Sequence, residues 1–436
     1  MNVEIIVRID GREVAAVEQR IPVTEELLCE EQTERLKDRI GQVVLEVGFG
    51  RLAAQVRHPC CCGRPMENRG KRCVTIASLS GDVVFERKRY RCRVCRSWRT
   101  PADAVVCCGQ HRMTRFLARQ VCQLATLEHF TRLEDLMADQ HGVHLGHDPM
   151  MRLVHDGGGV AEAERLTEVE HWRGQPPGQR QWPQPEVTPR RVYVSCDGII
   201  YRTNQSEPDP QHAGSRRLIG RQMRVGCVYW QDQTERWHKR VIWGQEEDYL
   251  SFGAALFRLA CRCGYRQADE KIFAADGADW CWNIHRQYFA DAAGILDWYH
   301  ASEHVWACAK VLHKETTTAS AWVNEALNLL AESGGEGLLP WLLTQRDNLR
   351  GRKHQALQEL INYVQPRLDR MDYPDYRARN WAIGTGMIES TAKQLVATRL
   401  KGPGMHWCPH GATAVTALRA KDLNHEWHTF WQTLTI

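Results

Sequence analysis

Eight of the 17 cysteines in this 436-residue chain are crowded into one window of 49 residues. Three of them are consecutive, Cys60–Cys62, and are followed by Gly63. Cys92 and Cys95 form a Cys-x-x-Cys pair thirty residues after Cys62. The total number of cysteines is odd, and no secretory signal pattern precedes the window. A metal site therefore explains the window better than a disulfide framework does.

The two cysteine groups have the layout of a zinc ribbon, in which two short turns present four thiolates to one zinc ion. The second group has the usual two-residue spacer, and Gly63 permits a tight turn after the first. The sequence predicts Cys60, Cys62, Cys92 and Cys95 as the ligands, while the first pair could instead use another nearby ligand. Four protein ligands leave no open position, so the zinc would be structural.

The same window carries a concentrated positive charge. The whole chain has a net charge of +4, but residues 57–120 hold 15 Lys and Arg against four acids, a balance of +11, which leaves −7 for the remainder. A polyanion is the natural partner for such a module. Residues 86–96 are the densest part, and their six bases could meet the phosphates of a nucleic acid or form a solvated charged hairpin: Arg87, Lys88, Arg89, Arg91, Arg93 and Arg96.

Composition and periodicity divide the chain into five expected segments. A strand and helix region (1–56) precedes the basic module (57–109) and a helical region (110–173), which could contain a helix-turn-helix but has no decisive turn signature. Residues 174–189 are rich in Pro, Gln and Gly, which is typical of a linker. Strands and helices then alternate in 190–436, which predicts an α/β domain.

Two aspartates interrupt apolar strands of this α/β domain. Asp197 lies in the stretch 191–200 and Asp276 in the stretch 271–277, and each is followed by glycine. Either alone is compatible with an ordinary Asp-Gly turn. Because a buried carboxylate is costly unless it is paired or bound to a metal, two such positions in one domain indicate a cation or a basic partner.

A third acid, Glu389, lies in a segment that begins a helix after two glycines. The residues at 381–401 read WAIGTGMIESTAKQLVATRLK, with Lys393 four residues after the acid. A surface ion pair between these two side chains would give the same pattern. The acids are 79 and 113 residues apart along the chain, so only the fold can bring them together.

These segments resemble the DDE transposases of bacterial insertion sequences, specifically the ISKra-type family. The resemblance covers residues 50–425, and its most specific part is the segment around Glu389. It implies an RNase H-like catalytic core with a helical insertion at about 305–375, preceded by a zinc ribbon. It also implies that Asp197, Asp276 and Glu389 bind two Mg²⁺ ions, or Mn²⁺.

The resemblance suggests roles for further residues. Asp297 and His300 match an Asp-x-x-His motif that follows the second catalytic aspartate in related transposases, and His300 would orient a phosphate or a flipped DNA end. A structural histidine is the alternative. We expect Lys393, Arg399 and Lys401 to line the DNA backbone near the active site, with a solvated helix face as the alternative. Trp407 and His406 are candidates to stack on a base.

The resulting hypothesis is a transposase that cleaves DNA and transfers the strand at the ends of an insertion sequence. Its partners would be double-stranded DNA, as terminal inverted repeats and target, and further copies of the chain in a homodimer or larger oligomer. The alternative is a non-catalytic zinc-ribbon DNA-binding protein derived from a transposase. No apolar stretch approaches the ~20 residues that cross a bilayer, so we expect a cytoplasmic, nucleoid-associated protein with no membrane partner.

Overall fold

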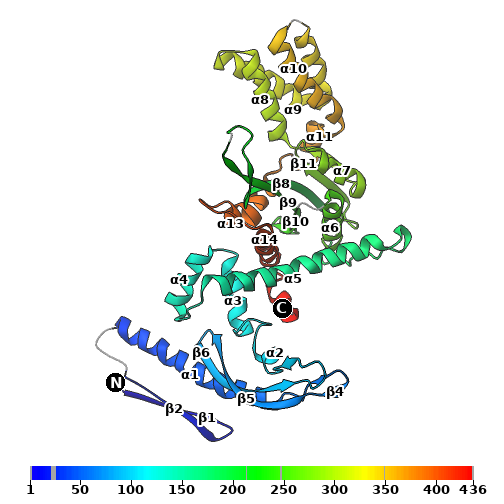
Figure 1. Cartoon of the computed structure of the whole chain (residues 1–436). Helices are drawn as coiled ribbons and strands as arrows, with labels where there is room; N and C mark the ends of the chain where they lie inside the picture. The colour runs from blue at the N-terminus through cyan, green and yellow to red at the C-terminus, as the bar shows by residue number, and fades with distance from the viewer. Residues whose placement is uncertain (1, 21–25, 213, 246–247, 348, 435–436) are drawn as a thin grey trace. The chain divides into compact units, whose positions relative to one another are not determined.

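The computed structural model describes residues 2–20, 26–212, 214–245, 248–347 and 349–434, and Figure 1 shows the chain coloured along its length. Tertiary contacts divide it into two compact units. The first comprises Met1–Glu162, Thr413–Asp422 and Glu426–Ile436, and the second comprises Ala163–Ala412 and Leu423–His425. This division differs from the expected segments, because most of residues 413–436 belong to the first unit instead of to the α/β domain.

The first unit begins with an antiparallel hairpin packed on a long helix. Val7 and Val17 of the hairpin are buried together with Leu36 and Val43 of the helix. The alternation of apolar and charged residues in both strands places one face against the helix and the other in solvent. The elements are β1 (Asn2–Ile9), β2 (Arg12–Arg20) and α1 (Glu26–Gln55).

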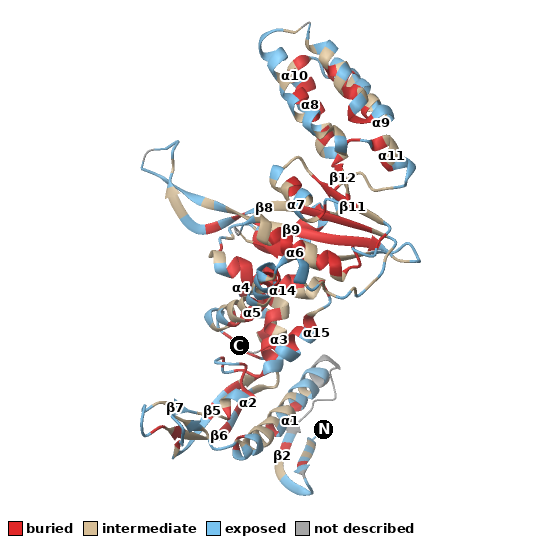
Figure 2. Cartoon of the chain, turned by 90° about the vertical axis from the view of Figure 1, so that its right-hand side faces the viewer, coloured by how far each residue is buried: buried red, intermediate tan, exposed pale blue. Residues whose placement is uncertain are grey.

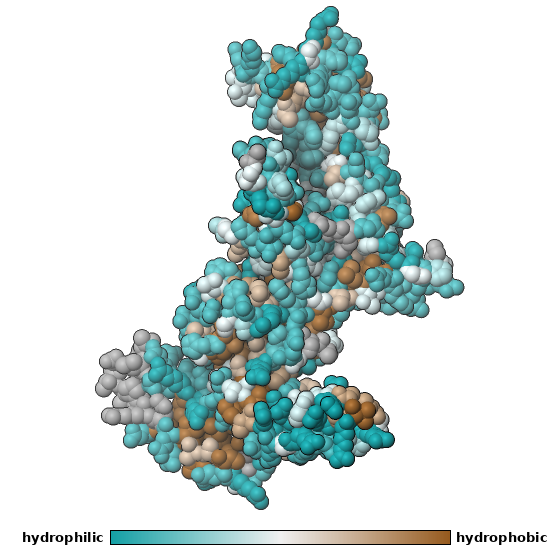
Figure 3. All heavy atoms as spheres, in the orientation of Figure 1, coloured by the Kyte–Doolittle hydropathy of each residue, from teal (hydrophilic) through white to brown (hydrophobic). Residues whose placement is uncertain are grey.

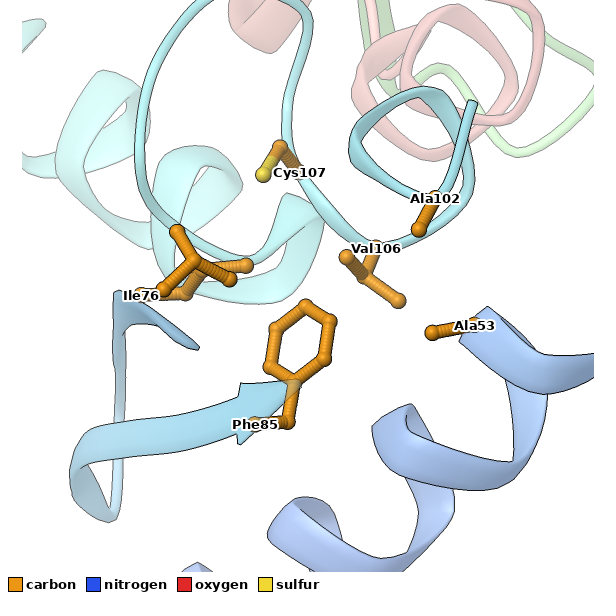
Figure 4. Close-up of a cluster of buried hydrophobic side chains, with 7 residues drawn as sticks. Ala53, Ile76, Phe85, Ala102, Val106 and Cys107 are labelled. Atoms are coloured by element: carbon orange, nitrogen blue, oxygen red, sulfur yellow. The ribbon is translucent and has the colours of Figure 1, made fainter. Parts of the chain in front are cut away.

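The cysteine-rich window forms a three-stranded antiparallel sheet beside α1 and a short two-stranded hairpin. Figure 4 shows the buried cluster at the contact with α1, where Phe85, Ala53 and Val106 meet. Cys107 belongs to this core, and burial raises the pKa of its thiol to about 11. The elements are β3 (Cys60–Cys61), β4 (Arg64–Pro65), β5 (Glu67–Ser78), β6 (Gly81–Arg91), β7 (Trp98–Arg99) and α2 (Asp103–Val106).

Helices fill residues 115–174, as the sequence predicted. Within the first unit, α5 and the C-terminal helix α14 approach closely at Gly158, because a Cβ there would lie 2.2 Å from the carbonyl oxygen of Ala414. Only glycine permits this packing. The elements are α3 (Arg115–Ala125), α4 (Phe130–His141), α5 (His147–Gly174), α14 (Pro409–Leu423) and α15 (Trp427–Thr433).

The second unit is built on a five-stranded mixed sheet, which confirms the predicted α/β class. The strand order is β10-β9-β8-β11-β12. The first three strands are antiparallel neighbours, while β8, β11 and β12 run parallel to one another. Figure 2 shows the buried centre of this sheet in red. The strands are β8 (Arg191–Pro208), β9 (Arg216–Gln231), β10 (Trp237–Gly244), β11 (Glu270–Ala275) and β12 (Ala293–Leu296).

Helices cover both faces of the sheet, which explains why its central strands are almost continuously apolar. On one face, Phe252 and Leu256 of α6 pack so closely on Gly226 that a Cβ there would lie 2.8 Å from Leu256. On the other face, the Nζ of Lys239 in β10 donates to the side-chain oxygen of Gln394, in the helical segment after Gly386, at 2.8 Å. The helices of the first face are α6 (Tyr249–Arg262) and α7 (Asp279–Tyr288).

A purely helical segment follows the last strand and occupies the region in which an insertion was expected. Its first helix packs on the next two, and Leu330, Leu338, Leu342 and Leu357 lie in its buried interior. The elements are α8 (Trp298–Leu312), α9 (Thr316–Arg346), α10 (Gly351–Val364) and α11 (Tyr373–Ala378).

Figure 3 shows a mostly hydrophilic surface, with hydrophobic side chains gathered around the N-terminal hairpin and α1 of the first unit. In this region Ile6, Val44, Leu52 and Val84 are each between 42% and 47% exposed. Among the described residues, no helix has both the length and the apolar content needed to cross a membrane.

Candidate active site and cysteine cluster

Strands β11 and β12 of the second unit end at one edge of the sheet, and the longer neighbouring strand β8 continues past it. Ser195 of β8 lies opposite Ala274 of β11 in a parallel ladder. Asp197 lies two residues after Ser195, and Asp276 lies two residues after Ala274. The two aspartates therefore occupy matching positions along neighbouring strands. The carboxyl ends of parallel strands are where ligands usually bind in open α/β sheets.

Glu389 reaches the same edge from a short helix that contacts β8 and β9. The helix predicted after the two glycines is interrupted by a π-helical turn, a feature often found at functional sites. Its three parts are α12 (Gly386–Ala392), the π turn (Lys393–Ala397) and α13 (Thr398–Leu400). Ile388, Thr391, Leu395 and Val396 face the protein interior and fix the helix on the sheet.

One cavity of about 160 Å³ brings the predicted residues together. Asp197, Asp276, Glu389 and His300, which are far apart in sequence, all line it. The complete lining is Cys196, Asp197, Asp276, Asp297, Tyr299, His300, Glu303, Thr385, Ile388 and Glu389. Carboxylate oxygens are the ligands that Mg²⁺ and Mn²⁺ prefer, so these side chains are of the type that binds a divalent cation.

His300 lies in the first turn of α8 beside the carboxylates. A Cβ on Gly277 would lie 3.3 Å from both its Nε2 atom and the Tyr363 hydroxyl, and 3.0 Å from the Tyr363 ring. Gly277 therefore lets the histidine and Tyr363 of α10 approach the backbone beside Asp276. The His300 ring also meets the His304 ring edge-on, with centroids 4.9 Å apart.

Burial and the neighbouring acids both affect the pKa of the Asp197 carboxyl. Burial raises the pKa of its carboxyl, and the nearby charges of Asp276 and Glu389 raise it further. The Gly198 N–H, which donates to Oδ1 at 2.6 Å, and His300 act in the opposite direction. The cavity therefore disfavours an additional negative charge unless a cation is bound.

Neutralising Asp197 should stabilise the protein in buffer free of Mg²⁺. A carboxyl whose pKa is higher in the folded state binds more protons there, so the free energy of unfolding falls as the pH rises past the unfolded-state pKa. We expect Asp197→Asn to raise Tm by a few degrees at pH 7 and to lose this advantage as the pH is lowered. Added Mg²⁺ should reverse the order by stabilising only the wild type. Thermal melts check this, and a lower Tm for the variant without Mg²⁺ would contradict it.

The bases predicted to line the DNA near this site have different environments. Lys393 and Lys401 are exposed, as that role requires. The exposure expected for Arg399 is not observed: the residue is only 2% exposed, and its guanidinium lies over the Trp407 ring at 4.8 Å. Trp407 is itself 8% exposed. His406 remains exposed.

Backbone pairing explains the burial of Trp407. Its N–H donates to the carbonyl of Arg202 at 3.1 Å, and its carbonyl accepts from the N–H of Asn204 at 3.0 Å. The residue thus extends the edge of β8 and packs its ring inward on Arg399. This pair fixes the loop that presents Lys401 and His406.

A cysteine cluster in the first unit could hold zinc. The sulfur atoms of Cys61, Cys62, Cys92 and Cys95 all lie within 4.8 Å of one another. Cys61 Sγ is 3.7 Å from Cys62 Sγ and 3.4 Å from Cys95 Sγ. Tetrahedral coordination with Zn–S bonds of about 2.3 Å requires sulfur separations of about 3.8 Å. The cluster therefore fits a zinc ion.

Cys61 takes the place that the sequence analysis gave to Cys60. Cys60 and Cys61 are neighbours in strand β3, so their side chains point to opposite faces, and only Cys61 belongs to the cluster. Cys62 and Gly63 form the two-residue turn to β4, with φ of 51° and 70°. This turn returns the Cys62 thiol toward Cys61.

Hydrogen bonds favour the thiolate form of one cysteine in the cluster. The Ser97 hydroxyl, 3.1 Å from Cys95 Sγ, lowers the pKa of Cys95 to about 6. The neighbouring Cys61 thiol instead raises the pKa of Cys62 to about 12. Zinc binding must therefore displace at least one proton from the metal-free cluster.

The basic strand β6 has more internal partners than the sequence suggested. Arg87 forms an ion pair with Asp103 at 2.6 Å, and Arg93 bonds to Glu67. The guanidinium groups of Arg89 and Arg91 lie 4.4 Å and 5.6 Å from the ring centroid of Trp98, which is 48% exposed.

We define Arg89, Arg91 and Trp98 as the Arg–Trp patch. Arg91 and Trp98 are paired across β6 and β7, so they share a face. Lys88 points to the other face, and Arg96 is exposed after the second cysteine pair. Among the described residues, neither Arg89 nor Arg91 forms an ion pair with an acid.

Asp297 and Thr385 are two buried polar residues of the cavity lining for which the sequence predicts no separate role. Asp297 enters the predictions only as part of the Asp-x-x-His motif. Thr385 precedes Glu389 by four residues, one helical turn, and this spacing is the signal that could have identified it. Both side chains are buried, with exposures of 2% and 5%.

No protein-family model matches the chain, and no curated protein matches it. Among solved structures, the chain is similar to the Drosophila P element transposase strand transfer complex, with 9% sequence identity and a TM-score of 0.37. The similarity covers 72% of this chain and 93% of that chain.

Proposed function

We propose that this protein is a divalent-metal-dependent enzyme that cleaves and joins DNA, a DDE transposase of the ISKra-type kind. The observation that carries the proposal is the meeting of Asp197, Asp276 and Glu389 at one cavity. The strand order, with three antiparallel strands followed by two parallel ones, supports an RNase H-like core. The helical segment between β12 and α12 fits an insertion placed before the third acid.

The three carboxylates would hold two Mg²⁺ ions, or Mn²⁺. When bound, such ions activate a water or a 3′-hydroxyl and stabilise the leaving oxygen of a phosphodiester. The chain's own part is to hold the three acids around one cavity beside the sheet. His300, in the first turn of α8, is placed to orient a phosphate, and the reaction requires no covalent protein nucleophile.

The first unit would hold the DNA. The cluster of Cys61, Cys62, Cys92 and Cys95 would bind a structural zinc ion, with no position left for catalysis. The zinc would fix the strands that carry the Arg–Trp patch. The DNA substrates would be the terminal inverted repeats and the target, which places the protein at the nucleoid. Joining two ends needs at least two active sites, so we include a homodimer or larger oligomer in the proposal.

Cleavage of a plasmid that carries the sequences flanking the gene tests the proposal. We expect the full chain to nick this DNA with Mg²⁺ or Mn²⁺ and to leave it intact without a divalent cation. A plasmid without the flanking sequences is the control. DNA binding with no cleavage under any of these conditions would instead support the non-catalytic DNA-binding alternative.

DNA affinity should depend strongly on salt and on the Arg–Trp patch. Each neutralised phosphate contributes about 0.9 to the slope of log K against log salt concentration. We expect the double variant Arg89→Ala/Arg91→Ala to weaken binding to a duplex of arbitrary sequence and to reduce the slope by about 2. Fluorescence anisotropy titrations measure both quantities. The matched control is Arg352→Ala on α10, and an unchanged slope in the patch variant would rule out the patch as the contact.

A further inference from the structure

Asp297 lines the same cavity as the three proposed metal ligands, so its role has to be distinguished from theirs. It directly follows β12, whose last residue Leu296 pairs with Ala275 of β11. The backbone N–H of Asp297 donates to the carbonyl of Ala275 at 2.9 Å. Ala275 immediately precedes Asp276. Asp297 is therefore attached directly to the strand end that presents the second carboxylate.

One carboxylate oxygen of Asp297 caps the helix that carries His300. Oδ1 accepts hydrogen bonds from the backbone N–H groups of Tyr299, at 2.5 Å, and His300, at 3.1 Å. This is the N-cap arrangement in which a short acidic side chain satisfies the first free donors of a helix. The cap fixes the first turn of α8 and hence the direction of His300.

The other carboxylate oxygen of Asp297 binds the segment that precedes Glu389 in sequence. Oδ2 accepts from the backbone N–H of Thr385 at 2.9 Å and also from the Thr385 hydroxyl. The same hydroxyl lies 3.2 Å from Oε1 of Glu389. A second link joins these segments, because the Trp298 N–H donates to the carbonyl of Ile383 at 3.0 Å.

We propose that Asp297 is a positioning residue, which acts through Thr385 on Glu389 and through the α8 cap on His300, and is not itself a metal ligand. This inference rests on the proposed function. Its backbone and side chain connect the three segments that carry Asp276, His300 and Glu389, each through a hydrogen bond. No other residue that lines the cavity is bonded to all three segments in the part of the chain that the structure describes.

The bonding state of Asp297 argues against metal ligation. The residue is 2% exposed, and both oxygens already accept two hydrogen bonds each. Turning either oxygen toward a cation would leave buried donors without partners, at a cost of about 1–3 kcal/mol for each. The Thr385 hydroxyl has a single proton, which it can donate either to Asp297 or to Glu389, so it links the two carboxylates as alternative acceptors.

The test measures Mn²⁺ binding to the whole 436-residue chain and to variants of it. Thr385→Val removes the hydroxyl with little change of shape, whereas Thr385→Ser retains it. We expect Thr385→Val to weaken Mn²⁺ binding by 10- to 100-fold, as is typical when support of a metal ligand is lost, and Thr385→Ser to restore it. Asp297→Asn retains an N-cap oxygen but presents an amide to the Thr385 N–H, so we expect weaker binding with an unchanged number of bound ions.

Calorimetric titration with Mn²⁺ supplies the affinity and the stoichiometry, and thermal melts show whether each variant is folded. Loss of one bound ion in Asp297→Asn would overturn the inference, because Asp297 would then be a ligand. Wild-type affinity in Thr385→Val would overturn it as well. Failure of the wild type itself to bind Mn²⁺ would count against the proposed function and remove the basis of the inference, so the two failures are distinguishable.

Discussion

Replacing Glu389 with Gln is expected to reduce metal-dependent DNA cleavage by at least about 10³-fold. Gln has nearly the same size but cannot supply the negative charge that holds a divalent cation beside Asp197 and Asp276. A bound metal contributes several kcal/mol of transition-state stabilisation, and each 1.36 kcal/mol is about tenfold in rate. The same loss is expected for Asp197→Asn and Asp276→Asn. Nicking of a plasmid that carries the flanking sequences, followed over time with Mg²⁺, measures the effect.

The control for this series is Glu332→Gln, an exposed acid in the helical segment. It changes the net charge by the same amount, and we expect wild-type cleavage. DNA affinity should stay within a few-fold of wild type in all variants, because the proposed phosphate contacts lie elsewhere. If one of the three acids could be neutralised without loss of cleavage, its assignment as a metal ligand would be wrong.

Replacing Cys61 with Ser is expected to remove the zinc and unfold the cysteine-rich part of the first unit. Structural zinc contributes roughly 10–16 kcal/mol in small modules, which is comparable to the whole stability of an ordinary domain, about 5–15 kcal/mol. Little else holds this end of the sheet, where the local core consists of Met66, Tyr90 and Cys92. Elemental analysis should find one zinc per chain in the wild type and none in the variant after dialysis. The affinity of the Cys61→Ser variant for DNA should fall as well.

The neighbouring substitution Cys60→Ser is the matched control. Cys60 differs from Cys61 by one position in the same strand and lies outside the cluster, so we expect this variant to retain its zinc and its DNA affinity. The reverse result, with zinc lost from Cys60→Ser and kept by Cys61→Ser, would restore the ligand set expected from sequence. Absence of zinc from the wild type would end the zinc-ribbon proposal.

The α/β class of the second unit was predictable because its strands are apolar on both faces. The stretches 191–200 and 271–277 correspond to strands β8 and β11 of the sheet. An aspartate in such an apolar stretch stands out against its surroundings, which is why Asp197 and Asp276 were identifiable. Their pairing at one level of the sheet depends on the parallel register, and the sequence does not specify that register.

The choice between Cys60 and Cys61 was not decidable from spacing. It depends on which side of a two-residue strand faces the other cysteine pair, and shifting a strand by one position exchanges its two faces. A sequence with three consecutive cysteines is equally compatible with either register. The positive φ at Cys62 and Gly63 is the local feature that selects the observed one.

Arg399 illustrates a different limit. In sequence it looks like a basic residue on an exposed helix face, and charged residues are mostly exposed. Its burial depends on Trp407, which pairs with the edge of β8 about 200 residues earlier in the chain. The Asp297–Thr385 link is likewise a contact between segments 88 residues apart. Both contacts arise from tertiary pairing, which has no local signal.

Anomalous diffraction from crystals soaked in Mn²⁺ tests the central claim most directly. The account predicts two anomalous peaks about 4 Å apart, coordinated by Asp197, Asp276 and Glu389, with Asp297 still bonded to Thr385. Crystals of Glu389→Gln should lose at least one of these peaks. An empty cavity in crystals that bind Mn²⁺ elsewhere would contradict the assignment of this site as the catalytic metal centre.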